Sequence, residues 1–218
     1  MNNELKWLPT SVEKIKNSFK FESSNVLKKN LAYNIQYLQF LHKNILEQKT
    51  TTVLYKIRYK MFIINCMAVI EAVFIALLDE RNLIPVEEWK DGDHHHRKVN
   101  DNLIEIYYNR HRVAPYKKKI KFDEAINLIE KNKVLDITTA SFPVIKEIQN
   151  LRNHLHLDKA KSSYDTDYNK FDEKQFFAIK LVFYYVMSDK NISLNTDYIE
   201  FLHPKMSEFK KHFPNEKI

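Results

Sequence analysis

Glycine is almost absent from this chain, whose 218 residues include one glycine, six prolines and one cysteine. A single glycine leaves little of the turn chemistry that a β-protein needs, and it excludes the glycine-rich loops that cradle phosphate groups. One cysteine excludes an internal disulfide framework and a thiolate metal site. Because Cys66 lies in an apolar stretch, we expect it to be a core residue. These absences favour an all-α protein with almost no sheet.

The chain has one candidate for a membrane span, the apolar stretch 61–78. Asn65 and Glu71 interrupt this stretch, and a carboxylate at the centre of a bilayer is costly. The N-terminal residues also lack the charged-then-apolar layout of a signal peptide. We therefore expect a cytoplasmic protein without a membrane part, in which 61–78 belongs to the most buried helix of a bundle.

Glu71 would then be a carboxylate on an apolar helix, and such a group must be paired or protonated. Arg152, Arg58 or a buried tyrosine could pair with it. A structural pairing is the favoured interpretation, and a catalytic role for Glu71 is the alternative.

Apolar residues recur at helical spacing along most of the chain, with capping residues between the repeats. Thr10 with Glu13, and Asp172 with Gln175, match the capping-box pattern at the start of a helix. The expected helices cover approximately 10–21, 23–49, 52–80, 122–131, 141–157 and 172–188, with short helices at 100–110 and after 191. The core-facing residues expected in the two longest helices are Leu27, Leu31, Ile35, Leu38 and Leu41 or Phe40, and Leu54, Ile57, Met61, Ile64 and Ala68.

Two long helices joined by a short connection should lie antiparallel. Residues 1–218 are therefore expected to form a single-domain antiparallel helical bundle with an irregular insert at about 82–121. Within the insert, His94, His95 and His96 are residue types that bind metals, but adjacent histidines on a loop point in different directions. We expect a solvated loop there, and we expect neither a metal nor a cofactor in the protein.

The segment 151–157, with the sequence LRNHLHL, is the most informative part of the chain. Arg152 and His156 are four residues apart, so they project from the same side of a helix, whereas His154 points roughly 200° away from Arg152. Arg152 and His156 each follow a position of the expected buried stripe by one residue, which places them at the boundary of the core. That stripe consists of Val144, Ile148, Leu151 and Leu155.

A guanidinium beside a neutral imidazole provides the groups needed to cleave RNA. The imidazole could take the proton of a ribose 2′-hydroxyl near its ordinary pKa, and the arginine could hold the phosphoryl oxygens. The structural alternative is that arginine and histidine are favoured in the last turn of a helix, where they offset the helix dipole and bond its free carbonyls.

Three segments of the chain resemble the HEPN superfamily, the higher-eukaryote and prokaryote nucleotide-binding domains. They are 123–130 (DEAINLIE), 131–136 (KNKVLD) and Val144…Leu151-Arg152-Asn153…His156-Leu157. The signature of that superfamily is an arginine, usually followed by a polar residue, with a histidine four to six positions further in. In this chain three residues separate Arg152 from His156. The resemblance implies an all-α bundle, and many members are metal-independent endoribonucleases of toxin–antitoxin, abortive-infection or CRISPR-associated systems.

The resemblance also implies roles for the motif residues. His156 would act as general base or acid, Arg152 would stabilise the phosphorane, and Asn153 would orient the loop or the substrate. The products would carry 2′,3′-cyclic phosphate ends. The implied partners are a second copy of the chain with the two motif helices facing each other, an RNA substrate, and an antitoxin or regulatory protein. The alternative, favoured by the short spacing, is a catalytically silent dimeric module that binds a protein or a nucleic acid.

A formal net charge of +7 favours an anionic partner such as RNA. The lysine run Lys117, Lys118 and Lys119 could follow a phosphate backbone, with nearby tyrosines as stacking surfaces. Together with His154, these lysines are the expected substrate-binding residues. A solvated face is the alternative interpretation of such a run.

Overall fold

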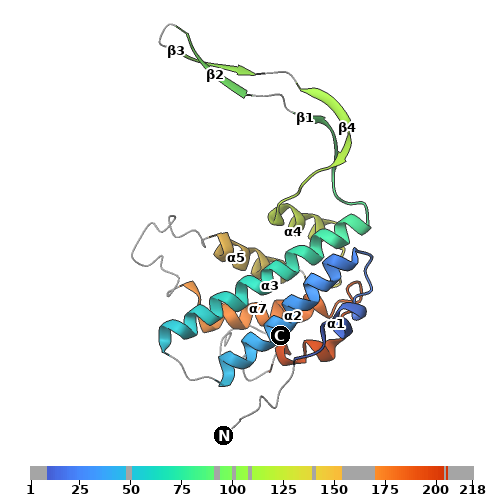
Figure 1. The fold of residues 1–218 in the computed structure, drawn as a ribbon, viewed down its shortest axis with the longest axis vertical. Helices are drawn as coiled ribbons and strands as arrows, with labels where there is room; N and C mark the ends of the chain where they lie inside the picture. The colour runs from blue at the N-terminus through green and yellow to red at the C-terminus, as the bar shows by residue number, and fades with distance from the viewer. Residues whose placement is uncertain are drawn as a thin grey trace.

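The computed structural model describes residues 9–47, 51–90, 94–99, 102–107, 110–138, 141–153, 170–203 and 205, with the backbone alone for 94–99, 102–107, 152 and 153. Most of these residues are helical (Figure 1). The helices are α1 (Val12–Ser18), α2 (Asn25–Glu47), α3 (Thr52–Glu80), α4 (Phe122–Lys131), α5 (Ser141–Asn153) and α7 (Glu173–Met187). The strands are β1 (Val86–Lys90), β2 (His94–Val99), β3 (Asn102–Tyr107) and β4 (His111–Lys117), and the 3₁₀ turns are η2 (Thr196–Tyr198) and η3 (Glu200–Leu202).

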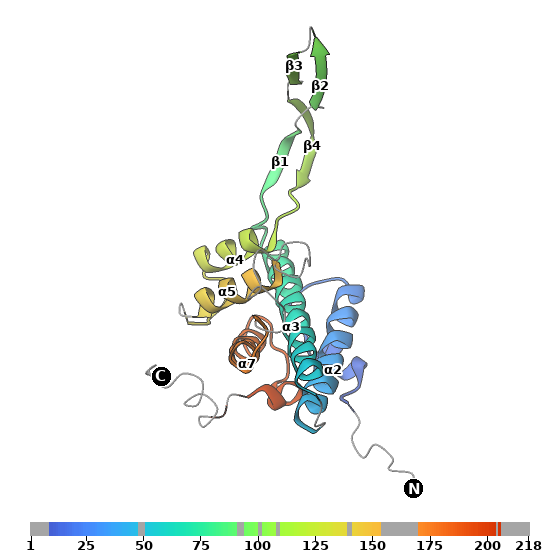
Figure 2. The same ribbon diagram turned by 90° about the vertical axis from the view of Figure 1, so that its left-hand side faces the viewer.

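Helix α3 is the centre of the bundle (Figure 2). It packs against α2 on one side and against α4, α5 and α7 on the other. The bundle has fully buried side chains from three helices, namely Phe62 and Phe74 of α3, Ile35 and Leu38 of α2, and Phe183 of α7. One apolar core therefore joins the N-terminal and C-terminal helices, and the mostly helical architecture expected from the sequence is confirmed.

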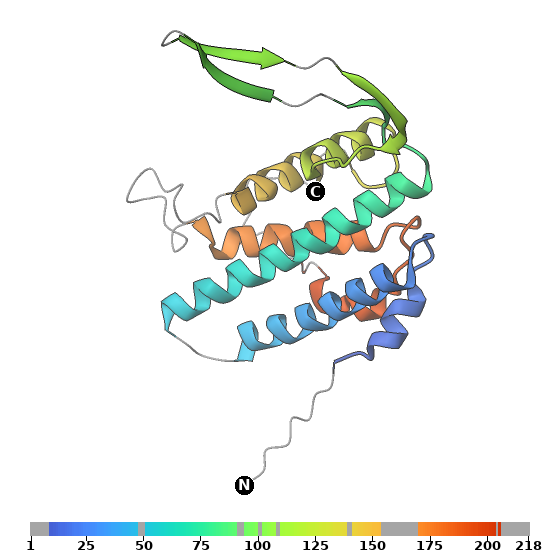
Figure 3. The same cartoon turned by 45° about the horizontal axis from the view of Figure 1, so that its top comes forward.

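Helices α2 and α3 form an antiparallel hairpin, as their short connection predicts (Figure 3). Helix α2 begins where Ser24 Oγ accepts a hydrogen bond from the Leu27 N–H at 3.1 Å. The expected capping box at the start of α7 is also confirmed, because Gln175 N–H donates to Asp172 Oδ1 at 3.0 Å and Asp172 N–H donates to Gln175 Oε1 at 3.2 Å. These local signals in the sequence fix where both helices begin.

The expected capping box at Thr10 and Glu13 is wrong. Ser11 caps α1 instead, by accepting a hydrogen bond from the Lys14 N–H at 3.4 Å. Thr10 has a different function, because its N–H donates to Gln39 Oε1 at 2.9 Å and so fixes the segment before α1 to α2. A hydroxyl residue near a helix start can thus serve a tertiary contact while its neighbour caps the helix.

The apolar face expected in α2 is confirmed. Leu31, Ile35, Leu38 and Leu41 are buried, whereas Phe40 points outward with 49% of its surface exposed. Of the two residues left open for the last position, Leu41 is therefore the core residue.

The prediction of which face of α3 is buried is wrong. Leu54 and Ile57 are each 49% exposed, while Phe62 and Cys66 on the other side of the helix are 0% exposed. Because α3 is apolar all round, its periodicity does not distinguish the core side from the outer side. Burial of Cys66 is as expected, and it raises the pKa of the thiol. We call the exposed or half-buried positions Leu54, Ile57, Met61, Ile64 and Ala68 the outer row of α3.

Helix α3 is also long and apolar enough to cross a membrane, judged by length and composition alone. Within its most apolar window 61% of the residues are buried inside the protein, and the core helix of a bundle passes the same test. Glu71 lies half-buried on this helix. The burial agrees with the interpretation of 61–78 as part of a central bundle helix.

A β-arm replaces the irregular segment expected at about 82–121. Strands β1 and β4 pair antiparallel, with Val86 opposite Lys117, and β2 pairs antiparallel with β3. Figures 1 and 2 show the two ribbons one after the other in an arm that projects from the bundle beside α4. The expectations of a helix at 100–110, of a loop at 94–96 and of almost no sheet are therefore wrong within the described residues, although these strands lie outside the helical core.

The residues of β2 and β3 explain why this hairpin forms without glycine. The segment 102–107 is rich in isoleucine, leucine and tyrosine, which favour strands. Val99 and Asn102 are register partners, so Asn100 and Asp101 connect the two strands. In the sequence these two residues are asparagine and aspartate, residue types that are common in turns without glycine. Scarce glycine is therefore weak grounds for excluding strands.

We expect the bundle to be stable without the arm. Val86 and Trp89 are 59% and 53% exposed, and a two-stranded ribbon contributes little stability by itself. An Asn-Gly turn in place of 88–115 would connect the register partners Glu87 and Tyr116. In urea titrations this deletion should change the free energy of unfolding by less than about 1 kcal/mol. A loss of several kcal/mol would show that the arm belongs to the core.

Candidate functional site

The motif helix expected at 141–157 begins at Ser141 as expected, and the structure describes it as α5 up to Asn153. Helix α5 packs against α3, α4 and α7. Lys146 Nζ donates to Glu130 Oε2 at 2.7 Å and so links α5 to α4. The helix that carries the motif is therefore an integral part of the bundle.

The buried side of α5 is rotated slightly from the expected stripe. Ile148 is buried as expected, and Val144 and Leu151 are partly buried against the core. Ile145 and Gln149 each follow a stripe position by one residue, and both are buried too, with 0% and 9% exposed. Positions that the sequence places at the core boundary are thus deeper than expected.

The candidate catalytic residues lie at the end of the described part of α5. The backbone of Arg152 and Asn153 is helical, while their side chains, and the whole of His154 and His156, lie outside the described residues. Arg152 follows the buried Gln149 by three residues, so its backbone position continues the series of buried positions along the helix.

The lysine run lies where the arm returns to the bundle. Lys117 forms an ion pair with Asp79, and Lys118 Nζ lies 3.4 Å from Glu124 Oε1, whereas Lys119 is exposed. Both ion pairs are solvent-accessible, and such pairs contribute little to stability. Two of the three expected substrate-binding lysines therefore have carboxylate partners, which would have to separate before these lysines could bind phosphate.

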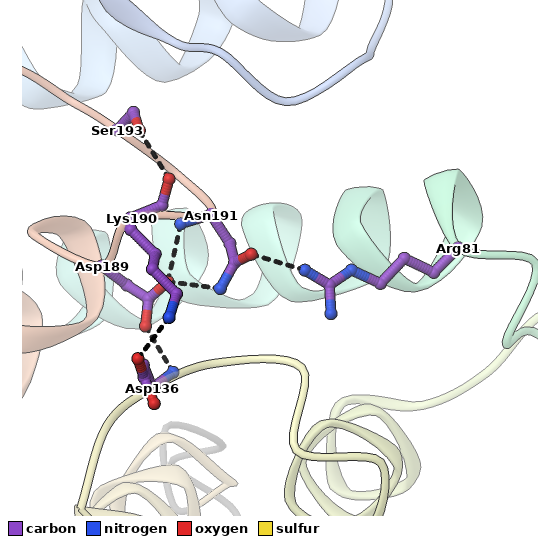
Figure 4. Close-up of polar contacts among 6 residues, drawn as sticks. All are labelled: Arg81, Asp136, Asp189, Lys190, Asn191 and Ser193. Carbon is purple, nitrogen blue, oxygen red and sulfur yellow. Dashed lines mark hydrogen bonds and ion pairs between the residues drawn. The ribbon is translucent and has the colours of Figure 1, made fainter.

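A group of polar side chains that the sequence interpretation missed joins three chain segments at the end of α7 (Figure 4). Asp189 is buried, and its carboxylate accepts hydrogen bonds from the Asp136 N–H at 2.5 Å and from the backbone and side-chain N–H groups of Asn191 at 2.8 Å each. Asn191 Oδ1 accepts from Arg81 Nη2 at 2.7 Å. A hydrogen bond from Lys190 Nζ, at 2.6 Å, holds the pKa of the Asp136 carboxyl below its ordinary value. Both carboxylate oxygens of Asp189 thus accept hydrogen bonds that join these segments, which indicates a structural role.

A pocket of about 760 Å³ opens between α2, α7 and the C-terminal turns. Three polar residues in its wall are buried, namely Gln39, His42 and Lys180. Buried polar groups gathered in a concavity are a common feature of ligand sites. The full lining is Thr10, Gln39, His42, Lys43, Leu46, Glu47, Lys180, Asp197, Glu200, Phe201, His203 and Lys205.

The imidazole of His42 packs among phenylalanine rings in this wall. Its centroid lies 6.2 Å from that of Phe176, in a stacked arrangement, and 5.1 Å from that of Phe201. Its Nε2 atom is buried and has no hydrogen-bond partner among the residues that the structure describes. Burial, followed by the positive charges of Lys180 and Lys205, lowers the pKa of His42 to about 4, so the ring is neutral at pH 7.

The sequence holds only a weak signal for this pocket. His42 occupies a core-facing position of α2, four residues after Leu38 and three before Ile45, and Lys180 interrupts an otherwise apolar run in α7. Each is a polar residue at a position where the periodicity predicts an apolar one. The signal does not show that the two residues share a cavity, because α2 and α7 are far apart in the sequence.

His42 should make the protein less stable in acid. The ordinary pKa of a histidine is 6.5 and that of folded His42 is about 4, so between these values the unfolded chain binds a proton and the native state does not. The stabilising contribution is complete above pH 6.5, and on the order of 3 kcal/mol of it is lost by pH 4. Urea titrations at pH 7 and pH 4 measure the free energy of unfolding at each pH. Between these two values it should fall by about 3 kcal/mol less in His42→Leu than in the wild type. Equal losses in both proteins would contradict this origin.

The candidate sites that follow are the motif that begins at Arg152 on α5 and the pocket at His42. They lie on different helices and depend on different residues. Comparisons of the chain with protein-family models, with curated proteins and with solved structures found no match.

Proposed function

We propose that this protein is a metal-independent endoribonuclease of the HEPN type, with Arg152 and His156 as its catalytic pair. The observation that carries the proposal is the backbone position of Arg152 on α5, where it follows the buried Gln149 by three residues. A further helical turn would place His156 on the same side of the helix as Arg152. The helical architecture and the net charge of +7 are compatible with this function.

In the proposed reaction the protein supplies all the catalytic groups. The neutral imidazole of His156 removes the proton of a ribose 2′-hydroxyl, the 2′-oxygen attacks the adjacent phosphorus, and the bond from phosphorus to the 5′-oxygen breaks. Arg152 stabilises the additional negative charge of the phosphorane through charge-assisted hydrogen bonds, and Asn153 orients the substrate. The leaving 5′-oxygen takes up a proton from water, the imidazolium of His156 returns its proton to the solvent, and the other fragment retains a 2′,3′-cyclic phosphate.

We also propose that the protein is a cytoplasmic homodimer in which two motif helices face each other, controlled by an antitoxin or regulatory protein. Phe142, Ile145 and Ile148 already pack in the core of the protomer. A dimer contact on α5 would therefore use its exposed positions, such as Glu147, and the residues after Asn153. His154 and the lysines at 117–119 would contact the RNA outside the catalytic pair.

The test uses the purified full chain with structured and unstructured RNAs, in buffers with and without a chelator. We expect cleavage that the chelator does not change, and we expect expression of the wild type to slow bacterial growth. RNAs that all remain intact, or cleavage that the chelator abolishes, would contradict the proposal.

The alternative is a catalytically silent binding module, and the outer row of α3 favours it. Leu54 and Ile57 are half exposed, and apolar surfaces of this kind commonly form protein contacts. With this function, RNA would remain intact, and sedimentation would show an association that Ile57→Glu abolishes without lowering the melting temperature. RNA cleavage that survives Ile57→Glu would instead support the enzyme.

A further inference from the structure

The outer row of α3 has the spacing of a seam between two helices. Its residues follow one another at intervals of three, four, three and four, namely Leu54, Ile57, Met61, Ile64 and Ala68. In a coiled coil the a and d positions alternate in this way, and a second helix packs against them. The outer row therefore has the pattern of a surface that packs against a helix, and not that of scattered exposed side chains.

The helices that pack against α3 leave this row open to solvent. Helix α2 lies on one side of α3, and α4, α5 and α7 lie together on the other (Figure 2). Leu54, Ile57 and Met61 are exposed, while Ile64 and Ala68 are half-buried. Neighbouring apolar side chains that remain exposed commonly mark a protein contact. The row thus offers about four turns of apolar helix surface to a partner.

The positions that flank the exposed part of the row carry positive charge on both sides. Arg58 lies toward α2, where its Nη1 donates to the Asn44 carbonyl at 3.2 Å. Lys60 lies on the side of α7, where its Nζ is 5.7 Å from the ring centroid of Phe171. A carbonyl and an aromatic ring leave the charge of a cation in place. These are the e and g positions of the seam, which select the partner of a coiled-coil helix by charge.

Most of the net charge of the protein belongs to the hairpin of α2 and α3. Residues 25–70 contain seven lysine and arginine residues and one carboxylate, that of Glu47. The formal net charge of the whole chain is +7, so the residues outside this range contribute only one of these charges. Whichever local ion pairs form, the rest of the chain has no excess of carboxylates that could neutralise the hairpin. The hairpin therefore attracts a partner with negative charge.

The charge and the shape of the row distinguish among its alternative occupants. A second copy of the chain would bring like charges together along the seam, which is unfavourable. Single-stranded RNA stacks its bases on aromatic rings, whereas this row is aliphatic. A helix on a membrane buries its apolar face about 5–10 Å deep, whereas the side chains of this row are at most half exposed. An acidic helix of another protein agrees with both the spacing and the charge.

We propose that the outer row of α3 binds an amphipathic helix of another protein, whose apolar residues pack against the row and whose flanking residues are acidic. Apolar residues at a and d positions of that helix would cover Leu54, Ile57 and Met61, and its carboxylates would balance the charge of the hairpin. Such an interface would serve a binding module directly. It is also compatible with a ribonuclease, because Arg152 lies on α5.

The test uses the full chain and two fluorescent synthetic peptides of about three heptads, with isoleucine at a and leucine at d. One peptide has glutamate at e and g, and the other has lysine at these positions. The anisotropy of each peptide is measured while the protein is added. The acidic peptide should bind at micromolar concentration and at least about tenfold more tightly than the basic peptide. Equal affinity for the two peptides, or binding of neither, would overturn the proposal.

Variants show whether the peptide binds to the outer row. Ile57→Gln should weaken binding of the acidic peptide at least about tenfold, because it places an amide in the seam. Val26→Gln is the matched control, since Val26 is an exposed apolar residue at the end of α2 that is far from the connection to α3. Melting temperatures show that the variants fold, and Leu54→Gln provides a second change in the row. Equal weakening in Ile57→Gln and Val26→Gln would overturn the proposal.

Two further measurements detect the other occupants. Sedimentation of the protein alone would show self-association that Ile57→Gln abolishes if a second copy covered the row. Vesicles of phosphatidylglycerol would retain the wild type but not Ile57→Gln if a membrane covered it. We expect neither result, and either one would overturn the proposal. Arg152→Ala should bind the acidic peptide like the wild type, so this outcome is independent of RNA cleavage.

Discussion

Arg152→Ala and His156→Ala should each abolish RNA cleavage while leaving the helical fold intact. Removing a general base typically lowers the rate by about 10²–10⁴-fold, and removing a group that stabilises the transition-state charge costs about 10²–10³-fold. Single-turnover cleavage of an end-labelled RNA measures both losses. Circular dichroism and thermal unfolding of the same samples show whether each variant is folded.

His154→Ala is the matched control, because position 154 is roughly 200° round a helix from Arg152. Its cleavage rate should lie within about tenfold of the wild type, since it could contribute to substrate binding but not to proton transfer at the proposed site. Cleavage that persists in both Arg152→Ala and His156→Ala would mean that this pair is not the catalytic one.

Asp189→Ala should destabilise the protein strongly. The change removes the acceptor of the N–H groups of Asp136 and Asn191. Asp189 is 6% exposed, so water cannot easily replace the lost carboxylate. Each buried group left unsatisfied costs about 1–3 kcal/mol, so we expect a loss of about 3 kcal/mol or more. For a chain of this size that corresponds to a fall in melting temperature of about 10 °C, which calorimetry measures directly.

Lys190→Ala provides the comparison for Asp189. Lys190 pairs with Asp136 at 2.6 Å, but the two side chains are 74% and 71% exposed. Exposed ion pairs contribute little to stability, so this variant should unfold near the wild-type temperature. If Asp189→Ala were no less stable than Lys190→Ala, the buried carboxylate would not be holding the three segments together.

Elements defined by neighbouring residues are the ones that sequence reasoning located well. The helix expected at 122–131 is α4 with the same bounds, and the helix expected at 52–80 is α3. The start of α7 follows from Asp172 and Gln175, whose mutual hydrogen bonds involve residues three apart. Caps and helical periodicity act within one or two turns, so a single sequence contains them.

Features that depend on distant contacts were missed or wrong. The outer row of α3 has the same apolar residue types and spacing as its buried side, and only packing against α2 and α7 decides between them. The pairing between β1 and β4 joins strands that are separated by another hairpin, so local patterns gave no sign of this pairing.

The two candidate sites also differ in whether neighbouring residues or distant contacts define them. The motif at Arg152 and His156 is visible in the sequence because four-residue spacing is a local property of a helix. The pocket at His42 became visible only when α2, α7 and the C-terminal turns came together around Lys180. Buried polar residues at core-facing positions are the one local signal that such a pocket leaves.

The most direct test of the proposed function is the chemistry of the cleaved ends. The wild-type protein is given an RNA with one preferred cleavage position and the same strand carrying a 2′-deoxy sugar on the 5′ side of that linkage. Because the 2′-oxygen is the proposed nucleophile, we expect the RNA to yield a 2′,3′-cyclic phosphate and a 5′-hydroxyl, and the deoxy linkage to remain intact. Cleavage of the deoxy linkage at an equal rate, or fragments ending in a 3′-hydroxyl, would contradict catalysis by Arg152 and His156.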